Sequence, residues 1–81
     1  MNDERIKFSG RLAQEEMTRQ QLELKIKGLV DSIRDCLDPF AGIDDLRTDE
    51  AAQQAFELAE CRIQWIEACG RIKALKKALG R

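Results

Sequence analysis

The side chains best suited to chemistry in this sequence are three cysteine thiols, at positions 36, 61 and 69, and the hydroxyls of Ser9 and Ser32. A thiol or hydroxyl becomes a strong nucleophile beside a general base, and histidine is the most common base. The sequence contains no histidine. It also lacks G-x-G-x-x-G and G-x-x-x-x-G-K-[ST], the glycine-rich loops that bind phosphate groups. We therefore expect no catalytic residue, no cofactor and no enzyme activity.

The spacing of possible ligands does not indicate a metal site either. A structural zinc site needs a close cysteine pair such as C-x-x-C, but Cys61 and Cys69 lie eight residues apart. That is roughly 12 Å along a helix, which is also too far for one disulfide. The acid-rich stretch 38–49 has Phe40 at its third position, where a calcium-binding loop needs an oxygen ligand. The three cysteines are thus expected to be small buried residues in a reducing cytoplasm.

Length and composition indicate one small domain that spans residues 1–81. The chain has 81 residues, of which 43 % are hydrophobic and 36 % are charged, and its formal net charge is −1. This apolar fraction is too high for a disordered tail, although so short a chain builds only a limited core. The chain does not open on an apolar run of signal-peptide length, and no 18 apolar residues follow one another. We therefore expect a cytoplasmic protein without a membrane span.

Two long segments with helical periodicity flank one turn-rich stretch, which predicts an all-α fold. The first helix is expected over about 3–37, because good helix formers predominate there and Pro39 disfavours helical conformation at the residue before it. The second helix is expected over about 48–79, with Thr48 as its N-cap and Gly80 as its C-cap. Two helices of similar length joined by the loop 38–47 predict an antiparallel helical hairpin.

Apolar residues in a 4-3-4-3 spacing on both helices predict a coiled-coil seam between them. The two rows are Leu22, Ile26, Leu29, Ile33 and Cys36 on the first helix and Ala52, Phe56, Ala59, Ile63 and Ile66 on the second. The antiparallel pairing that matches the two rows joins Leu22 with Ile63, Ile26 with Ala59, Leu29 with Phe56, and Ile33 with Ala52. This pairing is the sequence-based prediction of how the hairpin packs.

The second helix carries a further apolar row that the first helix is not expected to cover. The facing positions of the first helix include polar residues such as Gln20 and Lys27. Contiguous exposed apolar rows are uncommon on soluble monomers. The row is therefore expected to form a homodimer interface, giving a four-helix bundle, or to bind a different protein with Trp65 as anchor. The residues of this row are Leu58, Cys61, Trp65, Ala68, Ile72, Leu75 and Leu79.

Charged residues are segregated between the two ends of the expected hairpin. The end formed by both termini, residues 1–11 and 71–81, has eight basic and two acidic side chains. Residues 31–57, at the loop end, have eight acidic and two basic ones. In an antiparallel dimer each basic end would lie beside the acidic end of the other chain. The basic side chains are Arg5, Lys7, Arg11, Arg71, Lys73, Lys76, Lys77 and Arg81.

Two alternative functions follow from the same charges. The basic end could contact nucleic acid, although the slightly negative net charge and the lack of a recognised binding motif argue against this function without excluding it. The acidic loop end, which includes Asp44 and Asp45, could instead inhibit a host enzyme by covering a basic site. Both alternatives stay open at this point.

Three short segments of the chain show a familiar general layout. They are the opening Met1-Asn2-Asp3-Glu4-Arg5-Ile6-Lys7-Phe8, the central Leu37-Asp38-Pro39-Phe40 and the ending Lys77-Ala78-Leu79-Gly80-Arg81, with two heptad-like helices between them. This layout resembles small, mostly uncharacterised proteins encoded in Mu-like transposable prophages. The resemblance implies a bacterial cytoplasm and an accessory role in phage biology, and it implies no site residues. We expect a non-enzymatic helical protein–protein interaction module that associates with itself.

Overall fold

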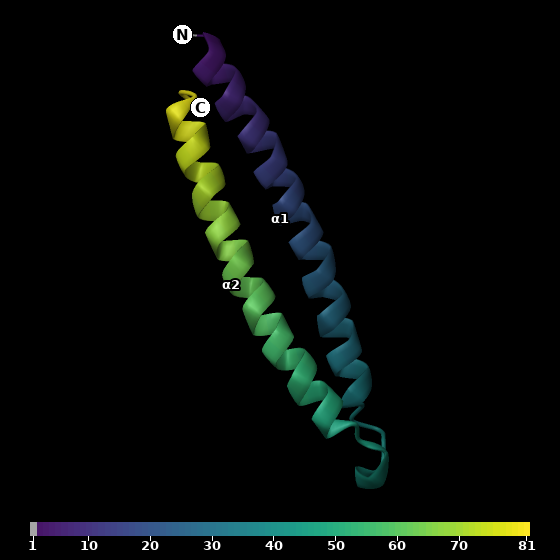
Figure 1. Ribbon diagram of the computed structural model, residues 1–81. Helices are drawn as coiled ribbons and strands as arrows, with labels where there is room; N and C mark the ends of the chain where they lie inside the picture. Colours follow the sequence, from purple (N-terminus) through teal and green to yellow (C-terminus); the bar gives the residue numbers. More distant parts are fainter. Residues whose placement is uncertain (1) are drawn as a thin grey trace.

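The protein is a hairpin of two long antiparallel helices, seen in a computed structural model that describes residues 2–81 (Figure 1). Helix α1 spans Asn2–Cys36, helix α2 spans Thr48–Ala78, and a short 3-10 helix, η1, spans Ile43–Asp45 in the connection. Residues 2–81 contain no strand. The expected all-α hairpin is confirmed. Met1, the first residue of the expected domain, lies outside the described residues.

Local sequence accounts for where the helices end. After α1, the carboxylate of Asp38 accepts a hydrogen bond from the backbone N–H of Phe40 at 3.0 Å, which closes a turn around Pro39. At the end of α2, Gly80 adopts a left-handed φ of 75°, and the N–H of Arg81 reaches the carbonyl of Lys76 at 2.8 Å. This geometry is the glycine C-cap that the sequence predicts. Thr48, however, is the first residue of α2 and not its N-cap.

Helix α1 presents the predicted row to α2. Cys36 is buried, and Leu22, Ile26, Leu29 and Ile33 are half-buried. The row continues towards the N-terminus through Leu12, which is buried in a cluster at the open end of the hairpin, the end formed by both termini. The members of this cluster are Leu12, Ile72, Leu75 and Leu79, with Phe8 packed against them.

Helix α2 is rotated about its own axis relative to the prediction, so that a different face contacts α1. The predicted seam residues Phe56, Ile63 and Ile66 are 70 %, 56 % and 48 % exposed, so their pairing with α1 is wrong. The physical reason lies at the open end, where Leu12 and Phe8 need apolar neighbours. The predicted seam would offer them lysines there, whereas the row that ends in Leu75 and Leu79 covers them.

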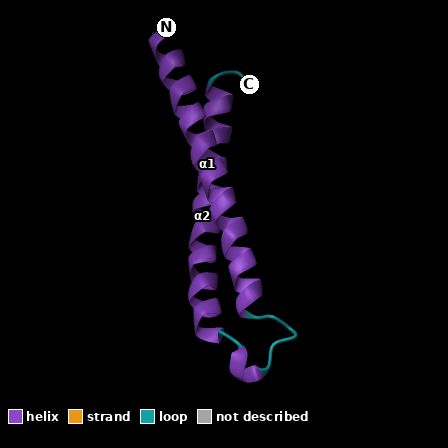
Figure 2. Cartoon of the chain, turned by 90° about the vertical axis from the view of Figure 1, so that its right-hand side faces the viewer, coloured by secondary structure: helices purple, strands orange, loops and turns teal. Residues whose placement is uncertain are grey.

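The alignment of the helices along their length agrees with the prediction to within three residues. Arg71 donates a hydrogen bond to Glu15 at 2.9 Å, and Lys25 forms an ion pair with Glu57 at 3.4 Å. At the open end a guanidinium nitrogen of Arg5 donates to the carbonyl of Leu79 at 3.3 Å. The helices run side by side over nearly their whole length, and the molecule is 64 Å long (Figure 2). Neither helix has the length and apolar character needed to cross a membrane, as judged over residues 2–81.

Candidate interaction surface

The most distinctive surface of the hairpin is an apolar row on the outer face of α2. Phe56, Ile63 and Ile66 project from this face, and the exposed alanines Ala52 and Ala59 lie between and before them in the same 4-3-4-3 spacing. We call Ala52, Phe56, Ala59, Ile63 and Ile66 the outer row. The 3.6-residue helical repeat places Ile63 and Ile66 about 200° and 140° around the helix from buried Cys61. The outer row therefore points directly away from α1.

The outer row is bounded by opposite charges. Continuing its spacing towards the start of α2 reaches Asp49, and continuing it towards the end of α2 passes Gly70 and reaches Lys73. Asp49 and Lys73 are both exposed, and neither takes part in an ion pair within the described residues. One face of one helix thus offers an acid, five apolar residues, a glycine and a base in sequence.

Helix α1 has a weaker outer face. Ile6, Met17 and Leu24 are each more than 60 % exposed, but Gly10, Ala13 and Gln20 separate them. The large side chains on this face lie seven or more residues apart, so they do not form a continuous apolar surface. Of the two outer faces, that of α2 is the better candidate for contact with another macromolecule.

The row that the sequence offered as an interface is not a free surface. Five of its members are buried in the hairpin, and Leu58 and Trp65 are half-buried. The expectation that this row is left uncovered is therefore wrong, because it packs against α1 itself. The indole nitrogen of Trp65 is buried without a hydrogen-bond partner, so Trp65 contributes apolar packing and not a polar anchor. The five buried members are Cys61, Ala68, Ile72, Leu75 and Leu79.

The basic side chains expected at one end are brought together by the hairpin, because both termini lie there (Figure 1). Two of them are engaged within the chain: Arg5 with the carbonyl of Leu79, and Arg71 with Glu15. The other six are exposed and form no ion pair within residues 2–81. These six are Lys7, Arg11, Lys73, Lys76, Lys77 and Arg81.

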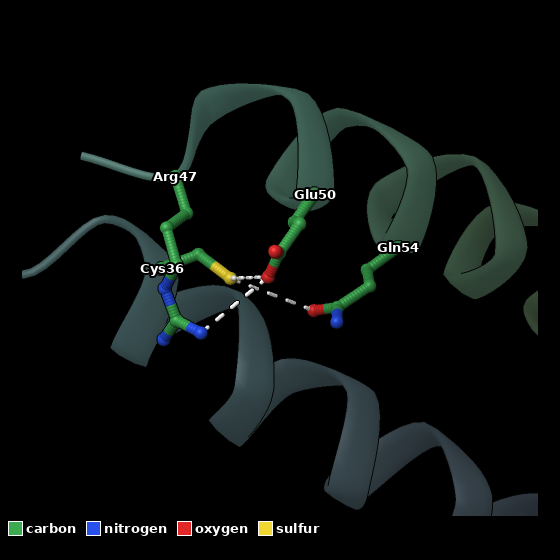
Figure 3. Close-up of polar contacts among 4 residues, drawn as sticks. All are labelled: Cys36, Arg47, Glu50 and Gln54. Carbon is green, nitrogen blue, oxygen red and sulfur yellow. Dashed lines mark hydrogen bonds and ion pairs between the residues drawn. The ribbon is translucent and has the colours of Figure 1, made fainter. Parts of the chain in front are cut away.

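The acidic end contains a small polar cluster around a thiol (Figure 3). The buried thiol of Cys36 lies 3.9 Å from a carboxylate oxygen of Glu50 and 4.0 Å from the side-chain oxygen of Gln54. Arg47 contacts the same carboxylate at 3.4 Å, and its backbone N–H donates to the carbonyl of Cys36 at 3.1 Å. The cluster joins the last turn of α1 to the first turns of α2. It therefore fastens the connection between the two helices.

Beyond the connection, Phe40 and Ile43 are almost fully exposed. A depression nearby is lined by both acidic and basic side chains, including Asp31, Arg34 and Asp35. Within the described residues no three histidine, cysteine or acidic side chains gather closely enough to hold a metal ion. The surfaces of this end offer exposed apolar side chains and charge.

Comparison with known proteins gives no indication of what these surfaces bind. No protein-family model matches the chain, and neither a curated protein nor a solved structure matches it. The resemblance to prophage proteins thus stays an expectation, and the geometry described above is the basis for a functional proposal.

Proposed function

We propose that this protein is a non-enzymatic helical interaction module that associates with itself through the outer face of α2. The observation that carries the proposal is the outer row, in which Phe56, Ile63 and Ile66 are about half or more exposed along one line. Aromatic and large aliphatic side chains arranged in this way are typical of contact surfaces. Twofold self-association is the most common way in which small soluble proteins cover such a surface.

The size of the hairpin core also supports the proposal. Only eight apolar residues are buried within residues 2–81, and none of the large ones is fully enclosed. A core of this size stabilises a single chain weakly. Covering Phe56, Ile63 and Ile66 would add apolar burial that the isolated hairpin lacks, so association and folding would reinforce each other.

The position of the outer row changes the expected form of the assembly. Because it faces away from α1, a copy docked on it would leave α2 between its own α1 and the other chain. The four helices would then form one layer. This arrangement replaces the closed four-helix bundle that the sequence leads one to expect.

The experiment that tests the proposal is sedimentation equilibrium over a wide concentration range, with two matched variants. We expect a dimer mass for the wild-type chain and for Leu24→Gln, which removes an exposed leucine from the outer face of α1. Phe56→Gln makes a comparable change on α2 and should give a monomer at the same concentrations. Circular dichroism of both variants should show unchanged helix content. A monomeric wild-type chain, or a dimer that depends on Leu24 and not on Phe56, would contradict the proposal.

A second candidate function rests on the six exposed basic side chains of the open end, which form no ion pair within the described residues. Such a cluster favours contact with the phosphates of nucleic acid. A gel shift that weakens with salt, and that disappears when Lys73, Lys76 and Lys77 are changed to Gln, would support this function. The absence of a shift at low salt with both DNA and structured RNA would eliminate it.

A further inference from the structure

We propose that the outer face of α2 binds the same face of a second copy in antiparallel orientation, with a twofold axis at the height of Cys61. This inference rests on the self-association proposed above and specifies its partner, direction and register. The axis would lie in the interface between the two copies of α2, on the side of each helix opposite the buried Cys61 thiol. Residues at equal distances before and after position 61 would face each other across the two chains.

This register pairs four of the five residues of the outer row with each other across the two chains. Phe56 and Ile66 are each five residues from position 61, and Ala59 and Ile63 are each two residues from it. Phe56 would therefore face Ile66 of the other copy, and Ala59 would face Ile63 of the other copy. Each pair joins an a-type heptad position of one helix to a d-type position of the other, which is the pairing found in antiparallel coiled coils. A small residue meets a large one in the central layers, which permits close packing.

The same register pairs the charges at both ends of the row. Asp49 and Lys73 are each twelve residues from position 61, so the carboxylate of one copy would face the ammonium group of the other, twice in the dimer. Lys77 would lie beside the connection of the second chain, which carries Asp44 and Asp45. Opposite charges at these places favour this orientation by attraction.

Other alignments are worse on the same evidence. A parallel dimer would place Asp49 against Asp49 and Lys73 against Lys73 of the second copy, at the edge of an apolar contact. An antiparallel dimer centred near position 57 or 58 would place Asp49 opposite Ile66. That contact would bury a carboxylate without a partner, which is costly. The charges therefore favour the antiparallel direction, and they favour a centre at position 61 over one near position 57 or 58.

Zero-length carbodiimide cross-linking of the wild-type protein tests this arrangement directly. The reagent joins a carboxylate and an amine that are already in contact. Asp49 and Lys73 are 24 residues apart, about 36 Å along one rigid helix, so a bond between them forms only between two chains. We expect mass spectrometry of the cross-linked dimer to identify the peptide that joins Asp49 to Lys73. A parallel dimer would keep these groups equally far apart and would not give this product.

Charge exchange and salt provide independent measurements of the same contact. Asp49→Lys and Lys73→Asp should each weaken the dimer about tenfold at low salt, and the double variant should restore it to within about threefold of wild type. In a parallel dimer all three variants would associate like the wild-type chain. Dissociation should also increase as NaCl is raised, because screening weakens the attraction between opposite ends. A parallel dimer would respond in the opposite way, since screening would relieve repulsion between like ends.

The outcomes separate this inference from the proposed function. A dimer that lacks the Asp49–Lys73 product and does not respond to either single charge reversal would overturn the antiparallel register, while self-association would stand. A monomeric wild-type chain at every concentration would overturn both. A dimer that yields the Asp49–Lys73 cross-link, and whose association is restored when Asp49→Lys and Lys73→Asp are combined, would establish the register.

Discussion

One substitution, isoleucine to alanine, tests the orientation of α2 when it is made at two positions of that helix. Ile72 is 3 % exposed and belongs to the core cluster, whereas Ile63 is 56 % exposed on the outer row. The sequence-based seam would bury Ile63 against Leu22, and the structure buries Ile72 against Leu12 and its neighbours. The two variants therefore distinguish the two orientations by the same chemical change.

The structure predicts different magnitudes for the two sites. Truncating a buried isoleucine to alanine costs about 2–5 kcal/mol, so Ile72→Ala should remove much of the free energy of unfolding of so small a domain. Ile63→Ala should leave the monomeric hairpin nearly unchanged. In the dimer, Ile63→Ala would remove the burial of roughly half a side chain per copy. The free energy of association would then fall by about 1–1.5 kcal/mol per copy, or about 2–3 kcal/mol for the two copies. The dimer should then dissociate about 30- to 150-fold more readily.

Two assays measure these effects separately. Urea unfolding followed by circular dichroism, at concentrations where the chain is monomeric, reports on the hairpin alone. Sedimentation equilibrium at higher concentrations reports on association. Equal destabilisation of the monomer by both variants, or a larger effect of Ile63→Ala on it, would refute the orientation of α2 described here.

Three further predictions concern single positions. Gly70→Ala should stabilise the hairpin by about 1 kcal/mol in thermal unfolding, because an added methyl group meets nothing within 4 Å and alanine favours the helix. Gly80→Ala should destabilise it by about 1 kcal/mol in the same assay, because Gly80 has a left-handed φ of 75°. Glu60→Gln should tighten the proposed antiparallel dimer in sedimentation. Glu60 is one residue from the proposed axis, so the carboxylates of the two copies would lie on the same side of the interface and repel each other. Weaker association of this variant would contradict that geometry.

The ends of the helices could be predicted from the sequence because they depend on local residues. Pro39 ends α1 nearby, and Gly80 provides the left-handed residue that closes α2. The contact row of α1 was also predictable near the connection, where Leu22, Ile26, Leu29 and Ile33 form its one continuous line of large apolar residues. These features require no knowledge of the partner helix.

The facing side of α2 could not be predicted in the same way, because α2 has apolar rows on two opposite faces. Near the connection either row fits α1, and the pairing of Leu29 with Phe56 is as reasonable there as any other. The choice is made at the open end, where Leu75 and Leu79 cover Leu12. A signal was present in the sequence: the row from Leu58 to Leu79 is unbroken, and the row through Phe56 meets lysine at position 73. The sequence pattern therefore predicts a core position for the surface that we propose for association.

The location of the core cluster has a consequence for the order of folding. Contacts beside the connection, such as that between Cys36 and Glu50, close a segment of 14 residues, whereas Leu12 and Leu75 are 63 residues apart. Closing the longer segment directly from the unfolded chain costs about 1 kcal/mol more in entropy, so pairing should begin at the connection and proceed outwards. During synthesis, Leu12 is made well before Leu75 and Leu79, the leucines that bury it. The N-terminal half of α1 should thus stay uncovered until the end of α2 has left the ribosome.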